Sequence, residues 1–340
     1  MAKEYNVAVV GATGLVGREM IEVLEQRGFP VKAFSPLASA RSAGEHVQFS
    51  GKDYIVKNAE APDAFDGVEI VLMSAGGGPS RELSPRAATA GAVVIDNSSA
   101  WRMDEDVPLV VPEVNADAVG GYEKKRIIAN PNCSTIQMVV ALKPLHERFG
   151  LKRVVVSTYQ AASGAGKSAM EELGEQVQAI FNVRDPEVKA FPKRLAFNCI
   201  PHIDVFQEDG FTKEERKMVQ ETRKIMGLPE LRVLPTCVRV PVFNGHAESV
   251  VAEFDSPVAA EEARTVLGDG NGLVVIDNPS ENAYPTQLDA EGQDGTYVGR
   301  IRTDPDDPNT LAFWCVADNI RKGAATNAVQ IAEILVERHL

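Results

Sequence analysis

The chain has 340 residues, of which 44% are hydrophobic and 24% charged, and its formal net charge is −13 at pH 7. This length predicts about two domains, each able to bury a core. The negative charge argues against nucleic acid and anionic membranes as partners. No apolar run approaches the roughly 18 residues that span a bilayer. The N-terminus lacks a signal-peptide pattern, so we expect a cytoplasmic protein.

The first 132 residues predict a nucleotide-binding fold. Residues 5–10 have the composition of a buried strand, a glycine turn follows, and apolar residues in helical phase continue to Gly28. Further apolar runs alternate with helical stretches; they are 31–35, 68–74, 92–98, 109–114 and 126–130. This alternation predicts a parallel sheet with both faces covered, as in Rossmann-like α/β folds.

The pattern changes after a helix that begins near residue 133. The segments that then predict strands, several of alternating polarity, are 151–160, 232–243, 248–254, 297–302 and 310–316. They indicate a mixed or antiparallel sheet with one covered face. The stretch from 277 to 307 is rich in loop-forming residues, and a final helix closes the chain. We therefore expect one domain over 1–132 plus 324–340, and a second α+β domain over 133–323.

The glycine turn predicts a dinucleotide site. Its GxxGxxG spacing lies between a strand and a helix, where backbone can approach pyrophosphate and the helix dipole favours an anion. The residues expected to contact the cofactor are Gly11, Thr13, Gly14, Leu15, Val16 and Gly17. The alternative is a turn that only packs the strand against the helix.

The end of the second strand favours NADP over NAD. An NAD site usually places a carboxylate there to bind the ribose hydroxyl, but no Asp or Glu lies between Val31 and Gly44. Ser39, Arg41 and Ser42 are present instead, and hydroxyls with a guanidinium suit a 2′-phosphate. Arg41 could also be an ordinary solvated loop residue. Ser74 begins a second glycine-rich turn that could approach the cofactor.

Cys133 stands out among four widely spaced cysteines. Pro131 restricts the residue before it to extended conformations, and Asn132 is a plausible helix cap. Cys133 then falls in the first helical turn, where the dipole favours a thiolate. Cys199, Cys237 and Cys315, in contrast, we expect to be packed free thiols. The spacing of the four predicts neither disulfides nor a metal site.

Two histidines are candidate acid/base partners for this thiol. They are His202, in "NCIPHID", and His246, which follows an Asn-Gly turn between two predicted strands. The sequence pattern alone does not choose between them. Arg239 lies on the preceding predicted strand, where its guanidinium could bind a substrate carboxylate.

The chain resembles the aspartate-β-semialdehyde dehydrogenase family over nearly its whole length. The motifs that carry this resemblance are "GATGLVG", "SARSAG", "DNSSAWRMD", "VPEVN", "NPNCST", "YQAASGAGK", "PHID", "CVRVPV", "GHAESV", "VGRIR" and "DNIRKGAATNAVQIAE". The resemblance implies a Rossmann-like NADP-binding domain followed by a catalytic and dimerisation domain with a mixed sheet. This is the architecture of glyceraldehyde-3-phosphate dehydrogenase.

The resemblance also implies roles for single residues. Cys133 corresponds to the nucleophile, His246 to the acid/base catalyst and Gln160 to the residue that orients the acyl intermediate. Arg239 corresponds to the ligand of the substrate α-carboxylate and Glu214 to the ligand of its ammonium group. From spacing alone, Glu215 competes with Glu214 for that last role.

Further family positions concern phosphate and cofactor. Arg102, Asn132 and Lys217 resemble a phosphate-binding set, although Lys217 lies in a charge-rich stretch that could be a solvated helix face. The additional positions that resemble cofactor contacts are Ser163, Gly164 and Asn319.

The implied reaction is the NADPH-dependent conversion of L-aspartyl-4-phosphate to L-aspartate 4-semialdehyde and inorganic phosphate through a Cys133 thioester. It serves the biosynthesis of lysine, threonine, methionine and isoleucine, and the implied assembly is a homodimer or homotetramer. One alternative is an N-acetyl-γ-glutamyl-phosphate reductase-like enzyme. The substrate of such an enzyme has a blocked amine, so Glu214 would have no ammonium group to bind. The other is a non-catalytic NADP-binding regulator.

Overall fold

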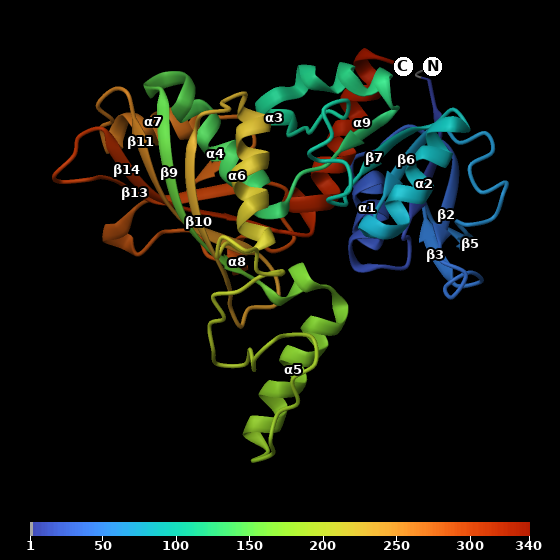
Figure 1. Cartoon of the computed structure of the whole chain (residues 1–340), viewed down its shortest axis with the longest axis horizontal. Coiled ribbons are helices and arrows are strands. Elements are labelled where there is room, and N and C mark those ends of the chain that lie inside the picture. Colours follow the sequence, from blue (N-terminus) through green and yellow to red (C-terminus); the bar gives the residue numbers. More distant parts are fainter. Residues whose placement is uncertain (1–2) are drawn as a thin grey trace. The chain divides into compact units, whose positions relative to one another are not determined.

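The computed structural model describes residues 3–340, and Figure 1 labels their helices and strands. Its contacts divide the chain into two units, Met1–Pro131 with Ala324–Leu340 and Asn132–Gly323. The chain therefore passes between the units twice, once immediately before Asn132 and once immediately after Gly323.

The first unit is built on a six-stranded sheet with the order β5-β2-β1-β6-β7-β8, in which all neighbours are parallel. Its strands are β1 (Tyr5–Val10), β2 (Val31–Ala38), β5 (Lys57–Asn58), β6 (Ile70–Met73), β7 (Val93–Asp96) and β8 (Ile127–Ala129). The chain leaves β1 toward β2 and later returns to β6 on the other side of β1. The switch point of this doubly wound sheet, where such folds bind ligands, therefore lies between β1 and β6.

Helices cover both faces of this sheet. They are α1 (Leu15–Gln26), α2 (Gly77–Thr89), α3 (Pro112–Asn115), the 3₁₀ helix η1 (Ala116–Lys124) and α9 (Thr326–Arg338). Right-handed crossovers place α1 and α2 on opposite faces, because the β1–β2 and β6–β7 connections run in opposite directions across the sheet. The C-terminal α9 packs on α1 and completes the core of this unit with Val329, Ile331 and Leu335.

Two local features of the first unit differ from the sequence-based expectation. The run 109–114 does not form a strand: Leu109 makes one isolated bridge to Ala129, and α3 begins at Pro112. Proline suits the first position of a helix, because the amide hydrogen that it lacks would have no helical partner there. A small hairpin of β3 (His46–Phe49) and β4 (Lys52–Ile55) was not expected.

The second unit contains a mixed six-stranded sheet with the order β10-β9-β11-β14-β13-β12. Its strands are β9 (Leu151–Gln160), β10 (Arg232–Arg239), β11 (His246–Phe254), β12 (Leu273–Val275), β13 (Thr296–Thr303) and β14 (Thr310–Ala317). The central strands β9, β11, β14 and β13 are antiparallel, and the edge strands β10 and β12 pair in parallel with their neighbours. The predicted fold class, a parallel-sheet Rossmann-like domain with a mixed-sheet domain, is confirmed.

One face of this second sheet is covered by helices, chiefly α4 (Cys133–Phe149), α6 (Lys213–Met226) and α7 (Ala260–Gly268). These helices and the sheet enclose a core that includes Met138, Leu142, Val156, Val250 and Phe313. The remaining helical segments are η2 (Ala162–Ala165), α5 (Lys167–Phe181), η3 (Pro279–Glu281), α8 (Gln287–Ala290) and the π-helix η4 (Arg321–Ala325). The α5 helix has a small apolar cluster of its own.

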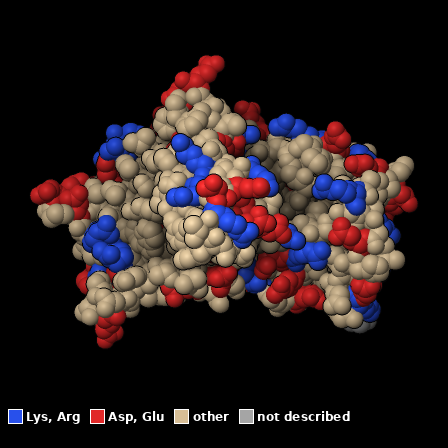
Figure 2. All heavy atoms as spheres, turned by 90° about the horizontal axis from the view of Figure 1, so that it is seen from below, with Lys and Arg blue, Asp and Glu red and all other residues tan. Residues whose placement is uncertain are grey.

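One face of the molecule carries side chains of both charges. Figure 2 shows acidic and basic side chains interspersed over one face, without a continuous basic field. Within residues 3–340, no helix is long and apolar enough to cross a membrane.

Candidate functional site

Three candidate residues lie close together at the ends of three neighbouring strands of the second sheet. Gln160 ends β9 and Arg239 ends β10, and the two residues are register partners in this parallel pair. His246 begins the antiparallel strand β11, one residue before Ala247, which pairs with Tyr159. All three side chains are buried. The sheet topology therefore brings together residues that lie up to 86 positions apart in the sequence.

Cys133 is the first residue of α4, as predicted. Asn132 caps this helix: its Oδ1 accepts hydrogen bonds from the amides of Ser134 (3.1 Å) and Thr135 (3.2 Å). Cys133 is partly exposed, whereas most of α4 behind it is buried. A thiol at a capped helix N-terminus is stabilised as the thiolate by the helix dipole.

Gly323 lies directly against this cysteine. A Cβ at Gly323 would be 2.8 Å from the Cβ of Cys133, closer than such atoms approach in proteins. A side chain at position 323 would therefore displace the thiol or the turn that carries it. The sequence analysis did not identify this contact, because the two residues are 190 positions apart.

His246 is held as a neutral ring. The backbone amide of Ala161 donates a hydrogen bond to its Nδ1 (3.1 Å), which leaves the ring proton on Nε2. Burial and the nearby charge of Arg239 lower the pKa of His246 to about 3, although Glu214 and the Gly245 carbonyl act in the opposite direction. Nε2 is buried and has no hydrogen-bond partner in the described structure.

The other candidate, His202, does not join this group. It is partly exposed and stacks on Phe206, with 4.3 Å between ring centroids. The geometry therefore favours His246 in the choice that the sequence pattern left open.

The peptide of Ala161 connects His246 to Arg239. Arg239 Nη1 donates to the carbonyl of Ala161 (2.6 Å), while the amide of the same residue binds His246. Gly164 packs on both side chains: a Cβ there would lie 2.9 Å from His246 Nε2 and 3.0 Å from Arg239 Nη1. The turn η2 thus fixes the imidazole and the guanidinium relative to each other.

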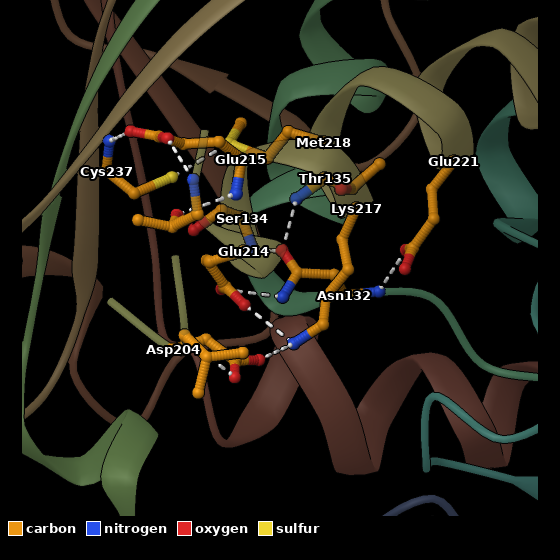
Figure 3. A network of polar contacts seen from close by, with 12 residues as sticks. Asn132, Ser134, Thr135, Asp204, Glu214, Glu215, Lys217, Met218, Glu221 and Cys237 are labelled. Carbon is orange, nitrogen blue, oxygen red and sulfur yellow. Dashed lines mark hydrogen bonds and ion pairs between the residues drawn. The ribbon is translucent and has the colours of Figure 1, made fainter. Parts of the chain in front are cut away.

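Glu214 is the centre of a buried polar network in the first turn of α6 (Figure 3). Its Oε1 accepts from Asn132 Nδ2 (2.8 Å) and Gln160 Nε2 (3.2 Å), and its Oε2 accepts from Lys217 Nζ (2.9 Å). Burial alone would raise the pKa of this carboxyl, but the charge of Lys217 and these hydrogen bonds lower it to about 2. Glu214 is therefore a carboxylate held beside the cysteine cap.

The neighbouring Glu215 has a structural position. It forms a capping box with Thr212, and its Oε1 accepts a hydrogen bond from the amide of Cys237 (3.0 Å). Both oxygens are thus occupied by backbone amides. Of the two adjacent acids, only Glu214 contacts Asn132 and Gln160.

Lys217 does not lie on a freely solvated helix face. Its Nζ pairs with Glu214 and with Asp204, each at 2.9 Å. Burial lowers the pKa of this lysine, but the two carboxylates more than offset that effect, so the pKa is raised. Asp204 belongs to the motif "PHID", which drew attention for its histidine, and its pairing with Lys217 was not anticipated.

Two further positions expected to contact the cofactor lie in the second unit. Ser163 and Asn319 hydrogen-bond to each other, with Asn319 Nδ2 donating to Ser163 Oγ (3.0 Å). Asn319 Oδ1 also accepts from the amide of Gly245 (2.9 Å), the residue before His246. Together with Gly164 they form the wall of the site next to the imidazole.

The glycine turn of the first unit lies at the predicted place, between β1 and α1. Gly11 has φ +82° and stands so close to the carbonyl of Ser74 that any side chain would clash. A side chain at Gly17 would clash with the backbone of Gly11. The N-cap residue Gly14 provides no side-chain hydrogen bond, so the first amides of α1 remain available for an anion.

The remaining cofactor candidates follow neighbouring strands of the same sheet. Ser39, Arg41 and Ser42 follow β2, and Ser74 follows β6. Arg41 is exposed, and no carboxylate of residues 3–340 forms an ion pair with it. These positions surround the carboxyl end of β1, as a dinucleotide site requires.

Arg102 also belongs to the first unit and is buried. Its Nε donates to the carbonyl of Asn130 and its Nη2 to that of Asn97, both at 2.9 Å. The three residues expected to bind phosphate are therefore divided: Arg102 lies in the first unit, whereas Asn132 and Lys217 lie in the second.

The other cysteines differ in exposure. Cys237 and Cys315 are buried, as expected, but the expectation of a packed Cys199 is wrong, because that residue is exposed. It lies in an irregular stretch between α5 and α6, where no sheet or helix covers it. Among residues 3–340, no cluster of His, Cys, Asp and Glu has the arrangement of a metal site.

Comparisons with known proteins agree with this geometry. Residues 6–122 match the family described as "Semialdehyde dehydrogenase, NAD binding domain", and residues 142–322 match "Semialdehyde dehydrogenase, dimerisation domain". Aspartate-semialdehyde dehydrogenase from Aquifex aeolicus is 57% identical over 99% of both chains, and that from Bacillus subtilis is 49% identical over the full length of both.

Solved structures give the same result. Aspartate semialdehyde dehydrogenase II from Vibrio cholerae, complexed with ASA, superposes with a TM-score of 0.97 at 50% identity and full coverage of both chains. The Candida albicans enzyme, solved with NADP, has a TM-score of 0.76 at 26% identity and 98% coverage of both chains. From its fold, its clustered cysteine, histidine and arginine, and these relatives, the chain belongs to the aspartate-semialdehyde dehydrogenase family.

Proposed function

We propose that this protein catalyses the NADPH-dependent reductive dephosphorylation of L-aspartyl-4-phosphate to L-aspartate 4-semialdehyde, in the biosynthesis of the aspartate-derived amino acids. The observation that carries the proposal is the convergence of Cys133, Gln160, Arg239, His246 and Glu214 in one unit. It provides a nucleophile, a proton donor and ligands for both charged groups of an amino acid.

Cys133 is the proposed nucleophile. Its thiolate attacks the acyl carbon of the substrate, the bond from that carbon to the phosphate oxygen breaks, and inorganic phosphate leaves with the bonding electron pair. Lys217, Asn132 and Arg102 are the proposed phosphate ligands. Asn132 already caps α4, so it would serve both purposes through different atoms: Oδ1 binds the helix amides, and Nδ2 carries two hydrogens of which Glu214 accepts one.

Arg239 and Glu214 are the proposed substrate ligands. An arginine has five N–H donors, and the carbonyl of Ala161 accepts from Nη1. The remaining donors can form a fork on the α-carboxylate. Glu214 is ionised and lies beside Gln160, so it can accept a hydrogen bond from an ammonium group. A substrate with a blocked amine would leave this buried carboxylate without that partner.

His246 is proposed to stabilise negative charge on the reacting oxygen. In its neutral form Nε2 carries the proton, so the ring can donate a hydrogen bond to an oxyanion and then transfer that proton. Gly164 leaves space beside Nε2 that a side chain at this position would fill.

The residues of the first unit fit NADP. The close approach of Gly11 to Ser74 and the uncapped start of α1 leave room and donors for a pyrophosphate, and Arg41 suits a 2′-phosphate. When bound, NADPH supplies the hydride that converts the thioester to the semialdehyde. The protein itself contributes the binding, the orientation and the proton from His246.

One assay tests the proposal. Aspartate semialdehyde, phosphate and NADP should give an increase in absorbance at the NADPH wavelength, and omission of phosphate should abolish it. An N-acetyl-γ-glutamyl-phosphate reductase would instead respond to the N-acetylated semialdehyde. A non-catalytic regulator would bind NADP without turnover, which calorimetry would detect.

We also propose that the protein is cytoplasmic and forms a homodimer or a homotetramer of dimers. The uncovered face of the second sheet supports assembly, since it carries the partly exposed side chains of Val155, Tyr159, Val251 and Trp314. Light scattering coupled to size-exclusion chromatography would measure the assembly, and a monomeric mass would contradict it.

A further inference from the structure

Glu248 is a buried acid that the proposed chemistry does not use. It lies on β11, two residues after His246, and its side chain is fully buried on the helix-covered face of the sheet. Its register partners are Thr158 on β9 and Cys315 on β14. Neither carboxyl oxygen has a hydrogen-bond partner of regular geometry. Such a group costs free energy unless it has a function in the fold or in the site.

Gln137 faces this acid from α4. It is one helical turn beyond Cys133, is fully buried, and also lacks a partner of regular geometry for its amide nitrogen and oxygen. Burial raises the pKa of Glu248 well above its usual range, and the side-chain hydrogen bond of Gln137 only partly opposes this effect. The two groups thus form an isolated pair of a carboxylic acid and a carboxamide beneath the start of α4.

The surroundings of the pair connect it to the catalytic residues on two sides. Cys315 Sγ donates to the backbone carbonyl of Gln137 (3.6 Å), so β14 also contacts this turn of α4. Thr158 Oγ1 donates to Gln160 Oε1 (3.1 Å). The titratable groups nearest the pair are Cys315 and Cys237, and burial raises the pKa of each thiol.

We propose that Glu248 is a positioning residue: with the Gln137 carboxamide it holds the first turns of α4, and with them Cys133, in place on the sheet. A neutral group is required, because a carboxylate beneath the helix start would oppose the thiolate. The pair acts through α4 and does not touch substrate. The effect on turnover rests on the proposed function, but the effect on the thiol does not.

The test compares four variants. Glu248→Gln keeps the size and a neutral hydrogen-bonding group, Glu248→Leu removes the pair, and Glu248→Leu with Gln137→Leu replaces both partners by apolar groups. Glu253→Gln is the matched control: Glu253 is on the same strand, but it binds Arg153 (2.7 Å) and is partly exposed. Two quantities are measured on folded protein: kcat, and the pH dependence of Cys133 alkylation by iodoacetamide, followed by peptide mass spectrometry.

We expect Glu248→Gln and Glu253→Gln to stay within about threefold of the parent in kcat and to keep the alkylation pKa. Glu248→Leu should lower kcat about tenfold or more and change the alkylation profile, because it leaves Gln137 unpaired. The double variant should recover most of that loss. If Glu248→Leu does not fold, Gln137→Leu tests the same contact from the helix.

Two outcomes would overturn the inference. One is a loss of more than about a hundredfold in Glu248→Gln, which would mean that an ionisable group is needed there. The other is a Glu248→Leu protein that melts at a lower temperature but keeps both the alkylation profile and kcat, because the acid would then only stabilise the fold. Failure of the parent protein to turn over aspartate semialdehyde would contradict the proposed function alone, since alkylation of Cys133 needs no substrate.

Discussion

The backbone amide of Ala161 donates a hydrogen bond to Nδ1 of His246, at 3.1 Å. This one contact selects the tautomer of a ring that is otherwise fully buried. In a protonated imidazole Nδ1 would carry a hydrogen that points at the amide hydrogen of Ala161, so the contact also disfavours the charged ring. His246 is therefore a neutral hydrogen-bond donor at neutral pH.

The first prediction follows from this neutral ring. The folded pKa of His246 is about 3 and the usual pKa is 6.5, so below pH 6.5 the unfolded chain binds a proton that the folded chain does not. The free energy of unfolding should fall by about 1.4 kcal/mol per pH unit from this group as the pH decreases from 6.5. His246→Gln should remove that part of the slope in urea titrations. Long-range ¹H–¹⁵N spectra should show Nδ1 unprotonated at pH 6.

The second prediction concerns Gly164. A methyl group there would lie 2.9 Å from His246 Nε2 and 3.0 Å from Arg239 Nη1, which is closer than van der Waals contact. We expect Gly164→Ala to lower kcat/KM by roughly tenfold to a hundredfold, because the two side chains must move apart. The matched control is Gly174→Ala, in the interior of α5, where a Cβ meets nothing within 4 Å. The control should keep its activity, and equal losses in both variants would contradict the argument.

The third prediction uses the carboxylate of Glu214. Its folded pKa of about 2 lies below the usual 4.5, so its contribution to stability is present above pH 4.5 and is lost as the pH falls toward 2. The size of this contribution is on the order of 3 kcal/mol. Glu214→Gln should be less stable at pH 7 and should show a smaller further loss down to pH 3. Glu253→Gln, measured by the same urea titrations, should behave like the parent.

The fourth prediction separates the two accessible cysteines. Cys133→Ser should lower kcat by at least about a thousandfold, since an alkoxide is not formed at neutral pH. Cys199→Ser should have no effect on kcat, although Cys199 is the more exposed thiol. Thiol labelling should modify both residues in the free protein, and substrate should protect only Cys133. Near-native turnover by Cys133→Ser would exclude the thioester.

The fifth prediction tests the choice of cofactor. Arg41→Ala should raise the KM for NADP by about tenfold or more and leave the KM for NAD unchanged, because only NADP carries the 2′-phosphate. Lys32→Ala removes an exposed charge from β2, the strand that precedes the Arg41 loop, and is the control. An equal effect of both changes on NADP would indicate long-range electrostatics and not a contact.

Local signals explain what the sequence could predict. Pro131 and Asn132 act on the residues next to them, so the start of α4 at Cys133 follows from backbone restriction and capping. The glycine turn before α1 is recognisable for the same reason. The prediction of a strand at 109–114 was wrong. The apolar residues of this segment have the composition of a strand, but Pro112 starts a short helix there.

Contacts between distant residues account for the remainder. Spacing alone could not separate Glu214 from Glu215, because the decision depends on which carboxylate meets Asn132 and Gln160, 82 and 54 positions away. Gly323 beside Cys133 and Glu248 beneath α4 carried no local signal. Only the sheet register brings Glu248 near the helix that bears the thiol.

The position of α9 in the chain has a consequence for the order in which the two units fold during translation. Residues 324–340 supply Ala328, Val329, Ile331 and Leu335 to the core of the first unit, but they leave the ribosome after the whole of the second unit. We therefore expect the second unit to reach its native state first, while the nascent N-terminal sheet waits with one face uncovered. Ribosome-bound chains that end at residue 323 and carry a linker long enough to clear the exit tunnel should resist proteolysis in the second unit and be cleaved in the first.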